Sequence, residues 1–216
     1  MTKKEKVLFI KKYFDKKYKD ADCTLEYKTP AELMIATILA AQCTDARVNI
    51  VTKDLFKKYP DISAFADADL KTLEQDIHST GFYHNKAKNI IASCKMLLSD
   101  FDGVVPDTME ELLKLPGVGR KTANLLLGDV FNKPAIVVDT HAKRITKLIG
   151  LTNNTDPNRV EMDLKKIVPP EYGSQFCHCL VYHGREICVA NRPKCDECGL
   201  VEICKHGGSV ERKNKT

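Results

Sequence analysis

The residues that could do chemistry lie in two segments. The first is Leu115-Pro116-Gly117-Val118-Gly119-Arg120-Lys121-Thr122, and the second is Val137-Val138-Asp139-Thr140-His141. Lys121 is expected in the first turn of a helix that begins near Arg120. The positive end of the helix dipole and the neighbouring Arg120 both favour a neutral amine, the form of lysine that can form a Schiff base. The alternative is a solvated surface lysine, because the chain has 34 Lys and Arg residues.

Asp139 is the acidic candidate. It follows the apolar run at 135–138 and precedes a helical pattern that reaches Ile149. Asp is a common N-cap, and a capping carboxylate is rigidly placed. The same carboxylate could manage protons or stabilise a positively charged sugar, and the two interpretations are compatible.

The glycines of the first segment predict a hairpin between two helices. A capping box at Asp107–Glu110 predicts a helix that runs to Leu115, where Pro116 and Gly117 stop it, and Gly119 allows the chain to turn back. Two positions without side chains let backbone N–H groups approach a ligand, and the start of the next helix could hold a phosphate. An ordinary packed corner is the alternative.

Four of the nine cysteines follow the spacing C-x6-C-x2-C-x5-C, at Cys188, Cys195, Cys198 and Cys204. Four thiolates bind either zinc or an iron–sulfur cluster, and the spacing alone leaves both open. No secretory or transmembrane segment is visible, so a reducing cytoplasm is expected and disulfides are not. The other five cysteines are predicted to be buried thiols: Cys23, Cys43, Cys94, Cys177 and Cys179.

Together, Leu-Pro-Gly-Val-Gly-Arg-Lys-Thr-Ala-Asn at 115–124 and Val-Asp-Thr-His at 138–141 resemble the helix-hairpin-helix DNA glycosylases, in particular the endonuclease III family. The resemblance extends from about residue 22 to 206. It implies that Lys121 attacks the sugar C1′ with help from Asp139. It also implies a 4Fe-4S cluster on the four cysteines, which follow directly after His183-Gly184-Arg185 as they do in that family.

The resemblance further implies a set of DNA-binding residues. Gln42 would enter the space left by a flipped base, although the flanking Ala41 and Cys43 depart from the usual family pattern. Phe82 would be an apolar wedge in the duplex, and a packed core aromatic is the equal alternative. Phosphates are expected to bind at the hairpin and at a basic loop that the cysteine cluster holds in place. These positions are Gly117, Gly119, Arg120, Arg192 and Lys194.

Helical periodicity without alternating strands predicts an all-α protein. The expected helices cover about 3–19, 33–41, 46–58, 70–77, 86–98, 107–115, 120–130, 140–149, 157–168 and 173–188. The family fold implies a six-helix domain at 22–132, with the helix-hairpin-helix motif at about 107–131. A second domain would join 1–21 to 133–216 and carry the cluster loop at 188–204, with a DNA groove between the two. A polar tail with Lys213 and Lys215 is expected to be disordered.

The resemblance therefore predicts a bifunctional DNA glycosylase and AP lyase of base excision repair. It would remove oxidised or damaged pyrimidines from double-stranded DNA and cut 3′ to the abasic site by β-elimination. A net charge of +5 permits such a partner. We expect a monomer in the cytoplasm, associated with the nucleoid and not with a membrane. Two alternatives remain. One is a monofunctional adenine or mismatch glycosylase of the same superfamily, of which the adenine branch usually lacks this lysine. The other is a non-catalytic DNA-binding iron–sulfur protein, in which binding alone gives no reason for the Lys121–Asp139 pair.

Overall fold

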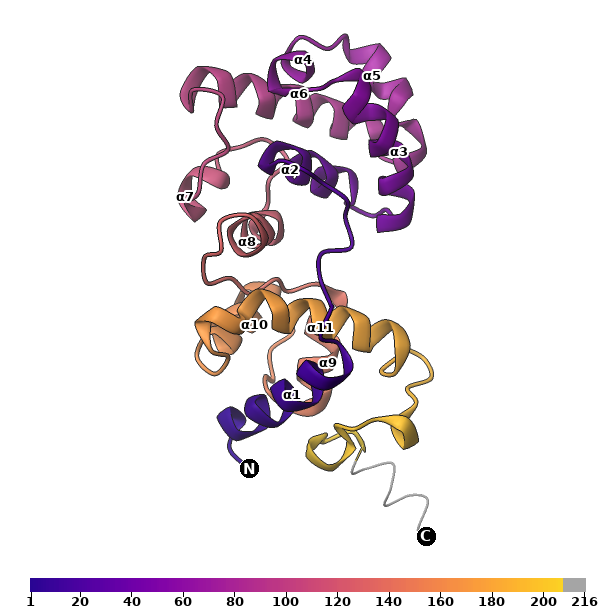
Figure 1. Ribbon diagram of the computed structural model, residues 1–216, viewed down its shortest axis with the longest axis vertical. Helices are drawn as coiled ribbons and strands as arrows, with labels where there is room; N and C mark the ends of the chain where they lie inside the picture. Colours follow the sequence, from indigo (N-terminus) through magenta and orange to yellow (C-terminus); the bar gives the residue numbers. More distant parts are fainter. Residues whose placement is uncertain (208–216) are drawn as a thin grey trace. The chain divides into compact units, whose positions relative to one another are not determined.

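The computed structural model describes residues 1–207, and within them the regular secondary structure is entirely helical (Figure 1). The predicted all-α class is therefore confirmed. The tail with Lys213 and Lys215 lies outside the described residues. Among the described helices, none is both long and apolar enough to cross a membrane.

The chain divides into two compact units. One is continuous and runs from Cys23 to Asn132. The other joins Met1–Asp22 to the chain from Lys133 onward, so its first helix comes from the opposite end of the sequence from the rest.

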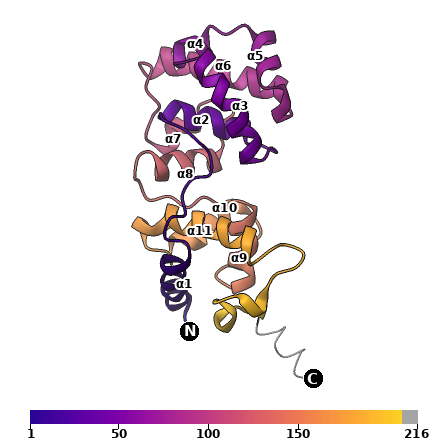
Figure 2. The same cartoon turned by 45° about the vertical axis from the view of Figure 1, so that its right-hand side comes forward.

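The continuous unit is built around α2 (Pro30–Leu39). Every residue from Leu33 to Leu39 is buried, because the helix is apolar nearly all round. Helices α3, α6 and α8 pack against α2, and Figures 1 and 2 show it lying among them. The other helices of this unit are α3 (Asp45–Lys58), α4 (Ile62–Ala66), α5 (Leu70–Asp76), η1 (His78–Thr80), α6 (Tyr83–Asp100), α7 (Met109–Leu112) and α8 (Arg120–Asp129).

Residues 23–132, all of which are described, thus hold seven α-helices where six were predicted. The additional element is α4, a five-residue helix whose start is capped by Asp61, which accepts a hydrogen bond from the Ala64 N–H at 2.8 Å. The apolar residues of a five-residue segment are too few to show helical periodicity, so the sequence does not predict this helix. Helix α6 also begins earlier than predicted, because its N-cap is the left-handed residue Phe82.

The helix before the hairpin differs from its prediction. Thr108, rather than Asp107, is the N-cap of α7, and its hydroxyl accepts from the Glu111 N–H at 3.3 Å and donates to the Glu111 carboxylate at 2.7 Å. Asp107 and Thr108 both have an acidic residue three positions later, so the sequence offers two equivalent caps. The helix ends at Leu112 instead of Leu115, and a turn follows it.

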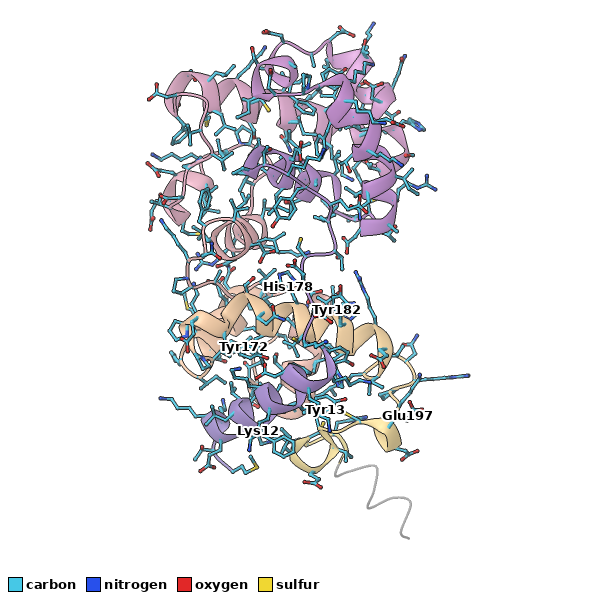
Figure 3. All side chains as sticks on the ribbon, in the orientation of Figure 1. Lys12, Tyr13, Tyr172, His178, Tyr182 and Glu197 are labelled. Carbon is cyan, nitrogen blue, oxygen red and sulfur yellow. The ribbon has the colours of Figure 1, made fainter. Side chains whose placement is uncertain are left out.

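The discontinuous unit is held together by an aromatic core between α1 (Lys3–Lys17) and α11 (Gly173–Glu186). The ring of Phe14 lies 6.2 Å from that of Phe176 and 5.7 Å from that of His183. Figure 3 labels Tyr13 on α1 and Tyr172 just before α11. The remaining helices of this unit are α9 (Thr140–Ile149), α10 (Pro157–Lys165), η2 (Pro170–Tyr172), η3 (Cys195–Glu197) and η4 (Val201–Ile203).

Candidate active site and cysteine loop

The hairpin turns at Gly117, and not at Gly119 as predicted. Gly117 has φ +81°, and a Cβ there would lie 2.9 Å from the Cβ of Asn89 on α6. Only glycine meets both the left-handed backbone and the close packing. The Ser93 hydroxyl of α6 donates to the Pro116 carbonyl at 2.5 Å, which fixes the hairpin to the long helix.

Gly119 has an ordinary extended backbone, with φ −95° and ψ 177°, and is the N-cap of α8. A Cβ at this position would meet no atom within 4 Å, so neither conformation nor packing within the unit requires glycine there. Among the described residues, no side chain caps the first turn of α8. An open approach to uncapped N–H groups at a helix N-terminus suits an anion.

Lys121 lies in that first turn and is exposed, while Arg120 is half-buried. The residues that follow, Thr122 to Leu127, are all buried and pack α8 against α2 and α7. The amphipathic helix therefore holds its backbone rigidly and leaves the Lys121 amine at the surface beside the open turn.

Asp139 is the N-cap of α9, and its Oδ1 accepts from the Ala142 N–H at 2.7 Å. The predicted capping role is confirmed. The segment leading to it, Ala135 to Val137, is buried. A Cβ on Gly173 would clash with the Ala135 carbonyl oxygen, so the start of α11 packs directly on this segment and holds it. Lys121 and Asp139 lie in separate compact units, and their cooperation stays a prediction.

Gln42 and Phe82 share two features that the sequence did not reveal. Both are exposed, Phe82 to 63% of its surface, and both have a left-handed backbone, with φ 55° and 49°. The alternative that Phe82 is a packed core aromatic is therefore wrong. Left-handed non-glycine residues carry strain and are concentrated at functional sites.

A residue between these two loops was missed. Lys86 on α6 is only 4% exposed, and its Nζ donates to the carbonyls of Leu39 and Thr80, both at 2.8 Å. A signal was present: Lys86 precedes Ile90 by four residues, so it falls on the apolar face of α6 with Cys94 and Leu97.

The four spaced cysteines all line one small cavity. Its walls include apolar Leu148, Ile187 and Val201. Burial raises the pKa of Cys188, Cys195 and Cys198, and the neighbouring cysteines raise it further. Four converging thiols whose thiolates repel one another need a positive group to neutralise them, so the residues fit a thiolate-ligated cluster. Within the described residues, no group of three or more His, Cys, Asp or Glu side chains has the geometry to hold a single metal ion.

Two cations bind the backbone around these cysteines. Arg144 on α9 donates to the carbonyl oxygens of Cys188 and, at 3.4 Å, Gly184. Lys6 on α1 donates to the carbonyls of Ile149 at 2.9 Å and Ile203 at 2.5 Å. The cysteine loop is thereby tied to both the first helix and α9.

All nine cysteines lie within the described residues, and none of them forms a disulfide. Of the five predicted to be buried, Cys94, Cys177 and Cys179 are buried, whereas Cys23 and Cys43 are half-buried. Both exceptions lie outside helices, Cys43 in the loop after α2. The basic residues Arg192 and Lys194 are exposed in the loop between Cys188 and Cys195, and their contact with phosphate stays a prediction.

Comparison with known proteins places these features in a family. Residues 35–170 match the HhH-GPD superfamily base excision DNA repair protein. The chain is 50% identical to endonuclease III of Synechocystis over 204 residues, which cover 94% of this chain and 93% of the relative. It is 37% identical to endonuclease III of Escherichia coli, over 87% of this chain and 89% of the relative.

Solved structures agree. A non-covalent endonuclease III–DNA complex and a trapped covalent endonuclease III–DNA intermediate each superpose with a TM-score of 0.92 at 43% identity, covering 98% of this chain and 100% of theirs. The chain therefore belongs to the HhH-GPD superfamily of base excision DNA repair proteins and, within it, to the endonuclease III family.

Proposed function

We infer that this protein is a base excision repair DNA glycosylase and AP lyase. The observation that carries the inference is the exposed lysine, Lys121, at the open and uncapped start of α8. A lysine there is next to the position where a DNA phosphate would bind, so its amine would reach the adjoining sugar. A relative with 43% identity has been trapped covalently on DNA, which supports a covalent route for this chain.

In this mechanism, the neutral amine of Lys121 attacks C1′ of the damaged nucleotide. The C1′–Nζ bond forms while the glycosidic bond breaks, and the base leaves with a proton. The sugar ring opens to a Schiff base. Loss of a 2′ proton then breaks the C3′–O bond, and water hydrolyses the Schiff base to release the lysine.

Asp139 stabilises positive charge on the same sugar and carries protons. Its capping bond to Ala142 supports this role, because the bond uses one carboxylate oxygen and fixes the orientation of the group. A carboxylate held in this way meets the requirement that a catalytic group be pre-positioned.

The DNA is held without reading its sequence. Arg120, Gly117 and Gly119 contact phosphates at the hairpin, and Arg192 and Lys194 contact them from the cysteine loop. Gln42 and Phe82 fill the space left by an extruded pyrimidine, and their exposure and left-handed backbones support this role.

Cys188, Cys195, Cys198 and Cys204 would hold a 4Fe-4S cluster. The cluster supplies structure, since breaking a glycosidic bond requires no electron transfer. The enzyme would act as a monomer on the nucleoid in the cytoplasm, with damaged pyrimidines in duplex DNA as its substrates.

Borohydride trapping tests the assignment, because it reduces a Schiff base to a stable protein–DNA adduct. The native protein should be trapped on a duplex with one oxidised pyrimidine. Lys121→Ala should give no adduct, whereas the matched control Lys114→Ala, an exposed lysine just before the hairpin, should be trapped as well as the native protein. Equal trapping of Lys121→Ala would refute the mechanism. A panel of duplexes, each with one lesion, then ranks the bases by release.

A further inference from the structure

Lys86 is an unusual core residue. Charged lysines are almost never fully buried, because removing an ammonium from water costs more than apolar packing returns. Burial lowers the pKa of Lys86, and the thiol of Cys43 opposes the shift. A neutral or apolar residue would pack here at lower cost, so the position calls for an explanation beyond filling space.

The two acceptors of Lys86 identify what the ammonium does. Leu39 is the last residue of α2, and Thr80 is the last of η1. Each carbonyl lies at a helix end, where the backbone has lost its helical donors. The compact ammonium has three donors on one atom and can hold both carbonyls at 2.8 Å. One side chain therefore joins two loops that are 41 positions apart in the sequence, measured from Leu39 to Thr80.

Both joined loops carry a strained, exposed residue. Gln42 follows Leu39 by three residues, and Phe82 follows Thr80 by two. Gly81, which lies between Thr80 and Phe82, also has a positive φ, of 70°. Exposed side chains at strained positions keep one orientation only when the surrounding structure determines it. In each loop, Lys86 bonds the last residue before the strained turn.

We propose that Lys86 is a positioning residue that holds the Gln42 loop and the Phe82 loop in one fixed relation, so that both side chains enter the duplex together when a nucleotide is extruded. The proposal rests on the proposed roles of Gln42 and Phe82. It predicts that Lys86 matters for acting on a base in a duplex and not for chemistry on an abasic sugar that needs no extrusion.

The test compares two substrates for Lys86→Met, which keeps the length of the side chain and removes its donors. Base release from a lesion duplex under single-turnover conditions should fall about tenfold to a hundredfold, the effect expected of a small misplacement. Cleavage of a preformed abasic site in single-stranded DNA should stay within about twofold of native. The control is Lys95→Met, the same change at an exposed lysine of α6. All rates are taken well below each variant's melting temperature.

A double-mutant cycle shows whether Lys86 acts through the wedge. In a Phe82→Ala background, Lys86→Met should slow duplex excision by a smaller factor than in the native background, because only Gln42 is left to position. Full multiplication of the two effects, or an equal loss on both substrates, would mean that Lys86 only stabilises the fold and would overturn the proposal. If Lys86→Met does not fold, Lys86→Gln, which retains an amide donor, is compared in the same way.

The outcomes separate this inference from the proposed function. If Gln42→Ala or Phe82→Ala slows duplex excision while Lys86→Met behaves like Lys95→Met, the proposed roles of Gln42 and Phe82 are supported and the positioning role of Lys86 fails. If neither Gln42→Ala nor Phe82→Ala slows excision, the proposed roles of these two residues fail and the inference about Lys86 fails with them. Loss of borohydride trapping in Lys121→Ala is independent of both.

Discussion

Gly117 and Asn89 are so close that the hairpin leaves no space for a side chain between them: a Cβ on Gly117 would lie 2.9 Å from the Cβ of Asn89. Gly119, two residues later, faces open space. The two glycines of one motif therefore serve different purposes. The fold requires glycine at position 117, while Gly119 leaves room for a ligand such as a DNA phosphate.

This difference predicts opposite phenotypes for two alanine variants. Gly117→Ala should lower the free energy of unfolding by about 1–3 kcal/mol, because it combines a left-handed alanine with overpacking. Gly119→Ala should lower that free energy by less than about 1 kcal/mol, because the site is open and alanine is only a poorer N-cap than glycine. Denaturant unfolding measures both, and each variant is the control for the other.

Gly119→Ala should also weaken DNA binding. The added methyl group of Gly119→Ala lies where a phosphate would approach the first turn of α8, so the dissociation constant for duplex DNA should rise about threefold to tenfold, or roughly 1 kcal/mol. Fluorescence anisotropy at fixed salt measures it. Native affinity in Gly119→Ala would show that the open turn is not a phosphate site.

The cysteine loop leads to a prediction about Lys6. Its two bonds, to Ile149 and Ile203, connect α1 to the backbone just before Cys204. Lys6→Met removes both, so the loop should open more often, and a chelator should strip iron about threefold to tenfold faster than from the native protein. The rate of cluster loss is measured from the fall in visible absorbance, and iron and sulfide analysis gives the cluster content of the starting protein. The exposed Lys16→Met on α1 is the control. Equal release rates, or a protein that holds zinc, would contradict the assignment.

Local patterns in the sequence were enough to predict most helices and their caps. Asp139 caps α9 as expected, because a cap depends on residues within one turn. The errors arise where the outcome depends on distant residues. The left-handed turn falls at Gly117 and not at Gly119 because Gly117 packs on Asn89, which lies 28 positions earlier. Likewise, α6 begins at Tyr83 because the preceding residue, Phe82, has a left-handed backbone.

Site residues show the same limit of local patterns. The motif segments could be recognised because their spacing is compact, and the cysteines do converge on one cavity. Lys86 was missed because its importance depends on two carbonyls, 47 and six positions away, that no sequence pattern connects. That Gln42 and Phe82 are exposed on left-handed turns likewise follows from tertiary structure, since neither residue type favours that conformation.

Cys94 gives a prediction about pH. It is fully buried on α6, and burial raises the pKa of its thiol to about 12 from an ordinary value of 9.0. Since the folded state holds this proton more tightly than the unfolded state, the group destabilises the fold as the pH rises from 9 toward 12. Below pH 9 the thiol is protonated in both states and the contribution is constant.

The free energy of unfolding of the native protein should therefore fall more steeply above pH 9 than that of Cys94→Ala, by at most about 1.4 kcal/mol per pH unit. The variant will be less stable at pH 7 because of its lost packing, so the measured quantity is the difference between the two slopes from pH 8 to 10.5. Buried tyrosines such as Tyr172, whose pKa burial also raises, contribute equally to both proteins and cancel. Parallel curves would mean that the Cys94 thiol reaches water in the folded state. The same exposure would make Cys94 react with iodoacetamide at pH 8 without unfolding, which peptide mapping of the alkylated protein would reveal.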